Sequence, residues 1–207
     1  MLLVPICTFA QEDRFVKGLA HTDLMLGGCG GWNIGAGIHF GKSAHRVNLQ
    51  TSINYSRVVK NDVSSQGENN YVNNTAPKEN YNEAIRYSRI SVPVELHIKF
   101  LDVFFAGAGA VYNYNMNGRI FDITDKENTT TALTDAVNAH NFAGRICAGM
   151  KLKSFEKFTI GLKIYTDINI TPPLKKYSVN DRLFEYKGAI KKSLGKVTFG
   201  MAAFCTF

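Results

Sequence analysis

Ionisable side chains fall on the polar positions of several segments in which apolar and polar residues alternate, so a regular strand would turn them all to one face. The set mixes acids and bases: Asp23, Arg89, Glu95, Lys99, Arg145, Lys151, Lys163 and Asp167. Gathered inside a barrel, such groups could form a proton relay, a ligand site or a narrow pore. They could equally pair with each other in an interior poor in water, because an isolated buried charge is costly. We favour this second interpretation, a structural charge network in the lumen.

Other chemistry has weaker support in the sequence. His21, His39 and His97 fall on the same polar faces but lack the close spacing of a metal site, so we expect no metal and no cofactor. Lipid-modifying barrels need an apolar lumen for an acyl chain or a Ser–His–acid set near the outer rim, and we identify neither. The sequence therefore predicts no catalytic residues and a protein that is not an enzyme.

Eight segments with a period of two must position these side chains. The clearest is 46–57, where Val47, Leu49, Ile53 and Tyr55 alternate with asparagine, glutamine and serine. Such a strand has one apolar face and one polar face, as the wall of a barrel in a membrane requires. The other strands are expected at about 16–26, 32–40, 87–100, 103–116, 141–153, 158–171 and 196–207.

The connections between these strands alternate in length. Tight turns are expected at 41–45, 101–102 and 154–157, and long polar connections at 57–86, 117–140 and 172–195. Short turns at one rim and long loops at the other are typical of outer-membrane barrels, whose short turns face the periplasm. No run of about 18 apolar residues is present, which excludes a transmembrane helix. The predicted fold is all-β, an eight-stranded antiparallel up-and-down transmembrane barrel.

The net charge of +7 is spread along the chain rather than clustered, which argues against nucleic-acid binding. The exception is the segment 172–195, which contains six basic and two acidic residues and so has a net charge of +4. At an outer-membrane surface this segment could contact the phosphates of lipopolysaccharide. The basic residues are Lys175, Lys176, Arg182, Lys187, Lys191 and Lys192.

The first ten residues read as the end of a secretory signal. They form an apolar stretch that closes on the small residue Ala10 before polar sequence begins, although no basic segment precedes them. We expect residues 1–10 to be a truncated signal peptide and residues 11–207 to be the barrel domain.

Several stretches resemble the PorT-like family of small bacterial outer-membrane β-barrels. They are the segment from Ile90 to Leu96 (ISVPVEL), the segment from Phe104 to Tyr112 (FFAGAGAVY), the stretch 28–40 and the final strand with Phe207. The resemblance implies an eight-stranded barrel that is secreted across the inner membrane and inserted into the outer membrane by the barrel-assembly machinery. These motifs are patterns of a fold and carry no catalytic signature.

We therefore expect an integral outer-membrane barrel with a structural or surface-interaction role, whose partners include outer-membrane lipid. One alternative is a narrow porin or an accessory component of a protein-secretion system. Another is a soluble ligand-binding barrel of lipocalin type, which would need the faces inverted, with apolar side chains inside and polar ones outside.

Overall fold

The structure, a computed structural model, describes the chain in segments. These are residues 15–26, 30–41, 45–66, 80–100, 103–122, 131–132, 137–155, 157–171, 173, 177–179, 182–184 and 197–207. Only the backbone is described at 60–66, 80–85, 119–122, 131–132, 177–179 and 182–184. The expected signal peptide, residues 1–10, lies outside the described residues. None of the described residues belongs to a helix that could span a membrane.

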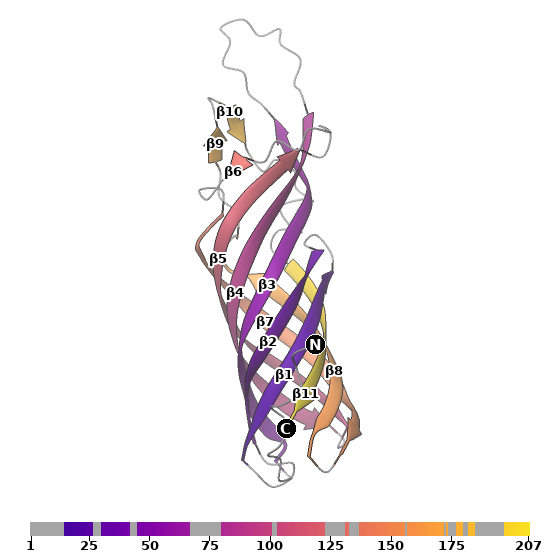
Figure 1. The fold of residues 1–207 in the computed structure, drawn as a ribbon. Helices are drawn as coiled ribbons and strands as arrows, with labels where there is room; N and C mark the ends of the chain where they lie inside the picture. The colour runs from indigo at the N-terminus through magenta and orange to yellow at the C-terminus, as the bar shows by residue number, and fades with distance from the viewer. Residues whose placement is uncertain are drawn as a thin grey trace, which may run out of the picture.

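Eight long strands form a closed antiparallel barrel (Figure 1). They are β1 (Val16–Leu26), β2 (Gly30–Phe40), β3 (Val47–Gln66), β4 (Asn80–Phe100), β5 (Phe104–Asp122), β7 (His140–Ser154), β8 (Thr159–Asn169) and β11 (Val197–Thr206). Each pairs with the next of these strands along the chain, and β11 pairs with β1 to close the cylinder. The predicted all-β, eight-stranded antiparallel up-and-down barrel is confirmed.

Three strands are longer than the alternation predicts. β3, β4 and β5 run for 20, 21 and 19 residues and rise beyond the ends of β1 and β2 (Figure 1). Their register shifts between Lys60 and Val63 and between Arg86 and Ser88, and the ladder then continues. Backbone hydrogen bonds form whatever the side chains are, so the ladder can continue past the last alternating residues. The sequence pattern therefore ends before the strands do.

Three short strands lie in segments that the sequence predicts to be connections. β6 (Thr131–Ala132) pairs with β5. β9 (Tyr177–Val179) and β10 (Arg182–Phe184) pair with each other in a separate two-stranded sheet. At the end of the barrel away from these short strands (Figure 1), the last residues of β2, β4 and β7 pair with the first residues of β3, β5 and β8, and we call this the short-turn end.

The two faces of the wall have opposite polarity. All eight strands carry large apolar side chains that point outward and are well exposed, for example Ile53 at 67% and Ile164 at 60%. Inward side chains are mostly polar, and among the described residues buried polar side chains outnumber buried apolar ones. The series Val94, Leu96 and Ile98 points outward. The soluble lipocalin-like alternative requires the reverse orientation, so the structure contradicts it.

Candidate functional site

Glu95 is the hub of a charge network inside the barrel. Its side chain comes from β4 and has no exposed surface. The carboxylate accepts hydrogen bonds from Arg145 Nη1 at 3.0 Å, from Lys163 Nζ at 3.1 and 3.2 Å, and contacts His97 Nε2 at 2.7 Å. Strands β4, β7 and β8 are thus tied together across the lumen. Two cations compensate the desolvation of this buried carboxylate.

Arg145 connects Glu95 to a second acid. Its guanidinium donates to both oxygens of Asp167, with Nε–Oδ1 at 2.6 Å and Nη2–Oδ2 at 2.8 Å. Arg145 Cζ also lies 3.9 Å from the centroid of the Tyr165 ring. The bidentate ion pair and the aromatic ring together hold the guanidinium in one orientation. This fixed geometry favours a structural role for Arg145 over a role in proton transfer.

A third acid joins the network from β1. Asp23 contacts His21 Nδ1 at 2.6 Å and accepts from Asn33 Nδ2 at 2.9 Å. Tyr165, whose ring lies against Arg145, also interacts with Asp23 and so connects this group to Arg145. His21 reaches across β2 to Asn54 Oδ1 on β3, at 2.9 Å from Nε2. The lumen is therefore crossed at this level by bonded side chains from β1, β2, β3, β4, β7 and β8.

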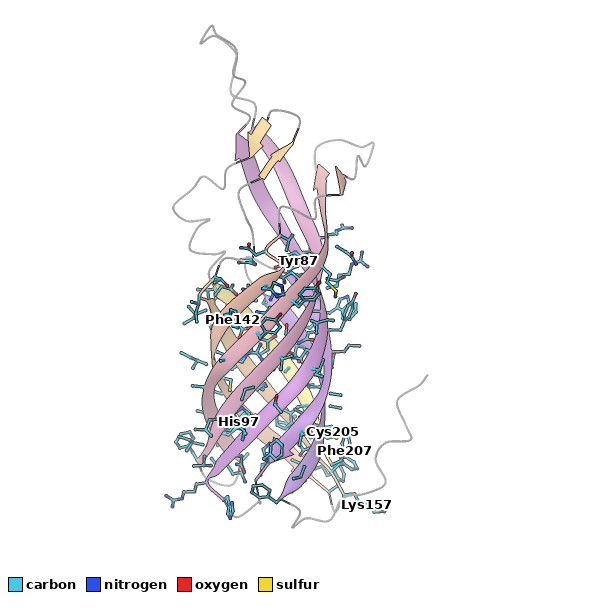
Figure 2. The ribbon with its side chains drawn as sticks, turned by 90° about the vertical axis from the view of Figure 1, so that its left-hand side faces the viewer. Tyr87, His97, Phe142, Lys157, Cys205 and Phe207 are labelled. Atoms are coloured by element: carbon cyan, nitrogen blue, oxygen red, sulfur yellow. The ribbon has the colours of Figure 1, made fainter. Side chains whose placement is uncertain are left out.

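The structure brings together five of the eight residues predicted for the network. Asp23, Glu95, Arg145, Lys163 and Asp167 form it as described. Arg89 is buried elsewhere and donates to Asn115 Oδ1 and to the Tyr87 hydroxyl, both at 2.9 Å. Lys99 and Lys151 line a cavity at the short-turn end instead. Figure 2 shows Tyr87 near one end of the barrel and His97 near the other.

One group in the lumen has the donor types of a metal site. Ligand atoms of Glu95, His97 and Cys147 lie within 4.8 Å of one another, and all three residues are buried. Arg145 and Lys163 already occupy the Glu95 carboxylate, so a divalent cation there would lie beside two fixed positive charges. This repulsion disfavours a metal, because a low-dielectric interior screens like charges poorly. The expectation of no metal site stays a prediction.

Another group resembles the hydrolase triad that the sequence did not reveal. His21 Nδ1 contacts Asp23 at 2.6 Å, and His21 Nε2 lies 3.3 Å from Ser52 Oγ. The amide of Asn54 is closer to Nε2, at 2.9 Å, and competes with the serine for it. A general base must be free to take the serine proton, and a substrate must reach the serine. Ser52 is buried and lies outside the cavity at the short-turn end, so we assign it no catalytic role.

The sequence predicted only part of this group of side chains around His21. His21 and Asp23 share a face two residues apart, as the sequence predicts. Ser52 and Asn54 lie on β3, which is separated from β1 by β2. A Cβ at Gly35 would lie 2.5 Å from His21 Nε2 and overlap the Asn54 amide oxygen, so only glycine leaves the passage open. No strand-by-strand reading predicts a contact that skips a strand.

The side chains of the six basic residues predicted to contact lipopolysaccharide are not described by the structure. Lys175, Lys176, Lys187, Lys191 and Lys192 lie outside the described residues, and Arg182 is described only by its backbone in β10. Their contact with lipopolysaccharide stays a prediction.

Comparisons with known proteins return only distant structural similarity. No family model matches the chain, and no curated protein matches it. Two solved structures align at 8% identity. One is Ail, the attachment invasion locus protein of Yersinia pestis, in complex with the heparin analogue sucrose octasulfate, with a TM-score of 0.35 over 93% of this chain and 97% of that one. The other is the translocator domain of the autotransporter NalP from Neisseria meningitidis, with a TM-score of 0.32 over 94% and 88%. Similarity at this level says nothing about function.

Proposed function

We propose that this protein is an integral outer-membrane β-barrel of a bacterium, with a closed lumen and a structural or surface-interaction role. The observation that carries the proposal is the inverted polarity of the wall. Large apolar side chains are exposed on the outside of every strand, while the buried acids and bases lie inside. In water this arrangement would expose an apolar ring far larger than monomeric soluble proteins tolerate.

The dimensions of the wall agree with this proposal. Strands β1, β2 and β8 each have 11 residues. At about 3.3 Å per residue and a tilt of about 45°, such a strand spans roughly 26 Å along the membrane normal. The apolar band of outer-membrane barrels is about 25 Å tall. The closed ladder also leaves no strand edge unpaired in hydrocarbon.

Fractionation of cells tests the location. The protein is expected in the outer-membrane fraction, and it should need detergent for extraction. On an unboiled gel it should migrate differently from the boiled sample, because a closed barrel resists unfolding by the detergent. Recovery of the folded chain from the soluble fraction without detergent would contradict the proposal.

A non-catalytic role is supported by the way the ionisable groups are used. Glu95, Arg145 and Asp167 bond to one another, and the buried His21 is held between Asp23 and Asn54. The resemblance to the PorT-like family favours insertion by the barrel-assembly machinery. The basic segment 172–195 favours contact with lipopolysaccharide at the cell surface. Loss of lipopolysaccharide association after neutralising those six basic residues would support this contact, and unchanged association would contradict it.

A narrow porin or a secretion accessory is the alternative, and conductance separates it from a closed barrel. Because bonded side chains cross the lumen at the level of Glu95, we expect the purified protein to give no conductance steps in planar lipid bilayers. Steady single-channel steps from the folded barrel would favour the porin. Co-purification with large periplasmic partners would favour the secretion role.

A further inference from the structure

A cavity of about 100 Å³ lies inside the barrel at the short-turn end. Its lining comes from strands on all sides and from the β7–β8 connection, which contributes Phe155 and Lys157. On the inner side lies an aromatic layer in which His97 stacks on Phe105 and the edge of Phe204 meets Phe105. In Figure 2, His97 and Lys157 both lie toward this end of the barrel. His97 also contacts Glu95 at 2.7 Å, so the layer lies between the cavity and the Glu95 network and touches both.

The lining is strongly cationic. Lys17, Lys99, Lys151 and Lys157 all belong to it, and His39 lies among them. None of the described residues in the lining is an aspartate or a glutamate. The four lysines bring positive charge to one small space, and this charge favours an anion over a cation as an occupant of the cavity.

Two polar side chains of the lining carry buried atoms that have no hydrogen-bond partner among the described residues. Asn48 is 2% exposed, and neither its Nδ2 nor its Oδ1 makes a hydrogen bond. His39 Nδ1 is also buried without a partner. Buried polar groups are normally satisfied, so such a pair calls for a ligand or ordered water. The orphaned groups and the lysines line the same cavity.

The position of Asn48 is fixed by a glycine. Gly41 has a φ of 142°, in the region that favours glycine, and a Cβ there would overlap the Asn48 amide. The turn after β2 therefore leaves room for the amide beside the cavity. A side chain at this position would drive the amide into the open space.

From these observations we propose that the cavity binds a phosphate-type oxyanion, held by Lys99 and Lys151 with Lys17 and Lys157 around it and by the amide of Asn48. The space suffices, because one water needs roughly 10–15 Å³ and the cavity offers several times that volume. Ammonium groups bind phosphate oxygens through charge-assisted hydrogen bonds, which are the stronger kind.

Such an oxyanion has two possible sources, a lipid headgroup or free phosphate. Phe104 and Phe155 belong to the lining and are also exposed, at 46% and 38%. The cavity is thus continuous with an aromatic surface of the kind that meets headgroups. Binding of the oxyanion does not depend on the proposed membrane location, and only the lipid source does.

The test uses the full chain, folded in an uncharged detergent, and inorganic phosphate measured by equilibrium dialysis with a radiolabel. The test variant is Lys99→Gln with Lys151→Gln. The matched control is Arg46→Gln with Arg57→Gln, which removes the same charge from two exposed residues that do not line the cavity. A mobility shift on boiling confirms that each variant is folded, and if the lysine variant fails this check, Asn48→Ala takes its place as the test variant.

We expect saturable binding by the native protein and by the control. The lysine variant should bind at least about tenfold more weakly, because it loses two charge-assisted contacts. Nanodiscs of phosphatidylcholine with a minor fraction of phosphatidylglycerol identify the source. Retention of phosphatidylglycerol by the native protein and not by the lysine variant points to a headgroup, and phosphate binding without lipid preference points to the free anion. Absence of saturable binding to either probe, or equal weakening in the control, overturns the proposal.

Discussion

Replacing Glu95 by glutamine is expected to lower the free energy of unfolding by about 3 kcal/mol or more. The substitution preserves shape but removes the charge that Arg145 and Lys163 share. Arg145 keeps its bidentate bond to Asp167, whereas Lys163 is left as a buried cation without its main partner. Breaking a buried pair from one side typically costs about 3–5 kcal/mol, mostly through the charge left behind. Urea unfolding of the detergent-folded protein measures this, with the single tryptophan, Trp32, as the reporter.

A second substitution distinguishes the effect of the unpaired charge on stability from the effect of changed packing. Adding Lys163→Met to Glu95→Gln removes the stranded cation, so the double variant should recover a large part of the lost stability. A double-mutant cycle should give a coupling of about 1–3 kcal/mol between the two residues. Lys153→Met, on an exposed lysine of β7, is the control and should change stability by less than about 0.5 kcal/mol. If Glu95→Gln behaves like this control, the network does not hold the barrel together.

The substitution Ile164→Arg is expected to impair insertion severely. Ile164 lies in the middle of β8, points outward and is 60% exposed, beside Ala148 and Met201 on the neighbouring strands. Arginine on the lipid face near the bilayer midplane costs about 2–4 kcal/mol. The folded fraction after refolding into phospholipid vesicles, read from the mobility shift on boiling, should fall accordingly.

The substitution Ser154→Arg is the matched control. Ser154 is exposed and ends β7 at the short-turn end, so the same substitution there should leave the folded fraction unchanged. The opposite result is also informative. If Ile164→Arg folds as well as the native chain and becomes more soluble without detergent, the outer face meets water and the membrane proposal is wrong.

The alternation of residue types anticipated the faces of the strands. Glu95 and His97 were predicted to lie opposite Leu96 and Ile98, and the structure has them buried and exposed in turn. Strand β1 was predicted at its observed bounds, Val16–Leu26. These features depend only on the two-residue period of a strand and on which side meets a polar lumen, so neighbouring residues suffice to determine them.

What the sequence alone determined, then, is which side chains turn inward: Arg89, Lys99 and Arg145 all do. Their level along the barrel axis was decided by the tertiary structure, because level depends on strand tilt and register around the whole cylinder. The strand register places Arg145 opposite Asp167 on β8. It places Lys99 and Lys151 at the level of the cavity at the short-turn end. It also brings Ser52 to His21 across Gly35. A period of two carries no information about depth, and so the partners of each charge appear only when the barrel closes.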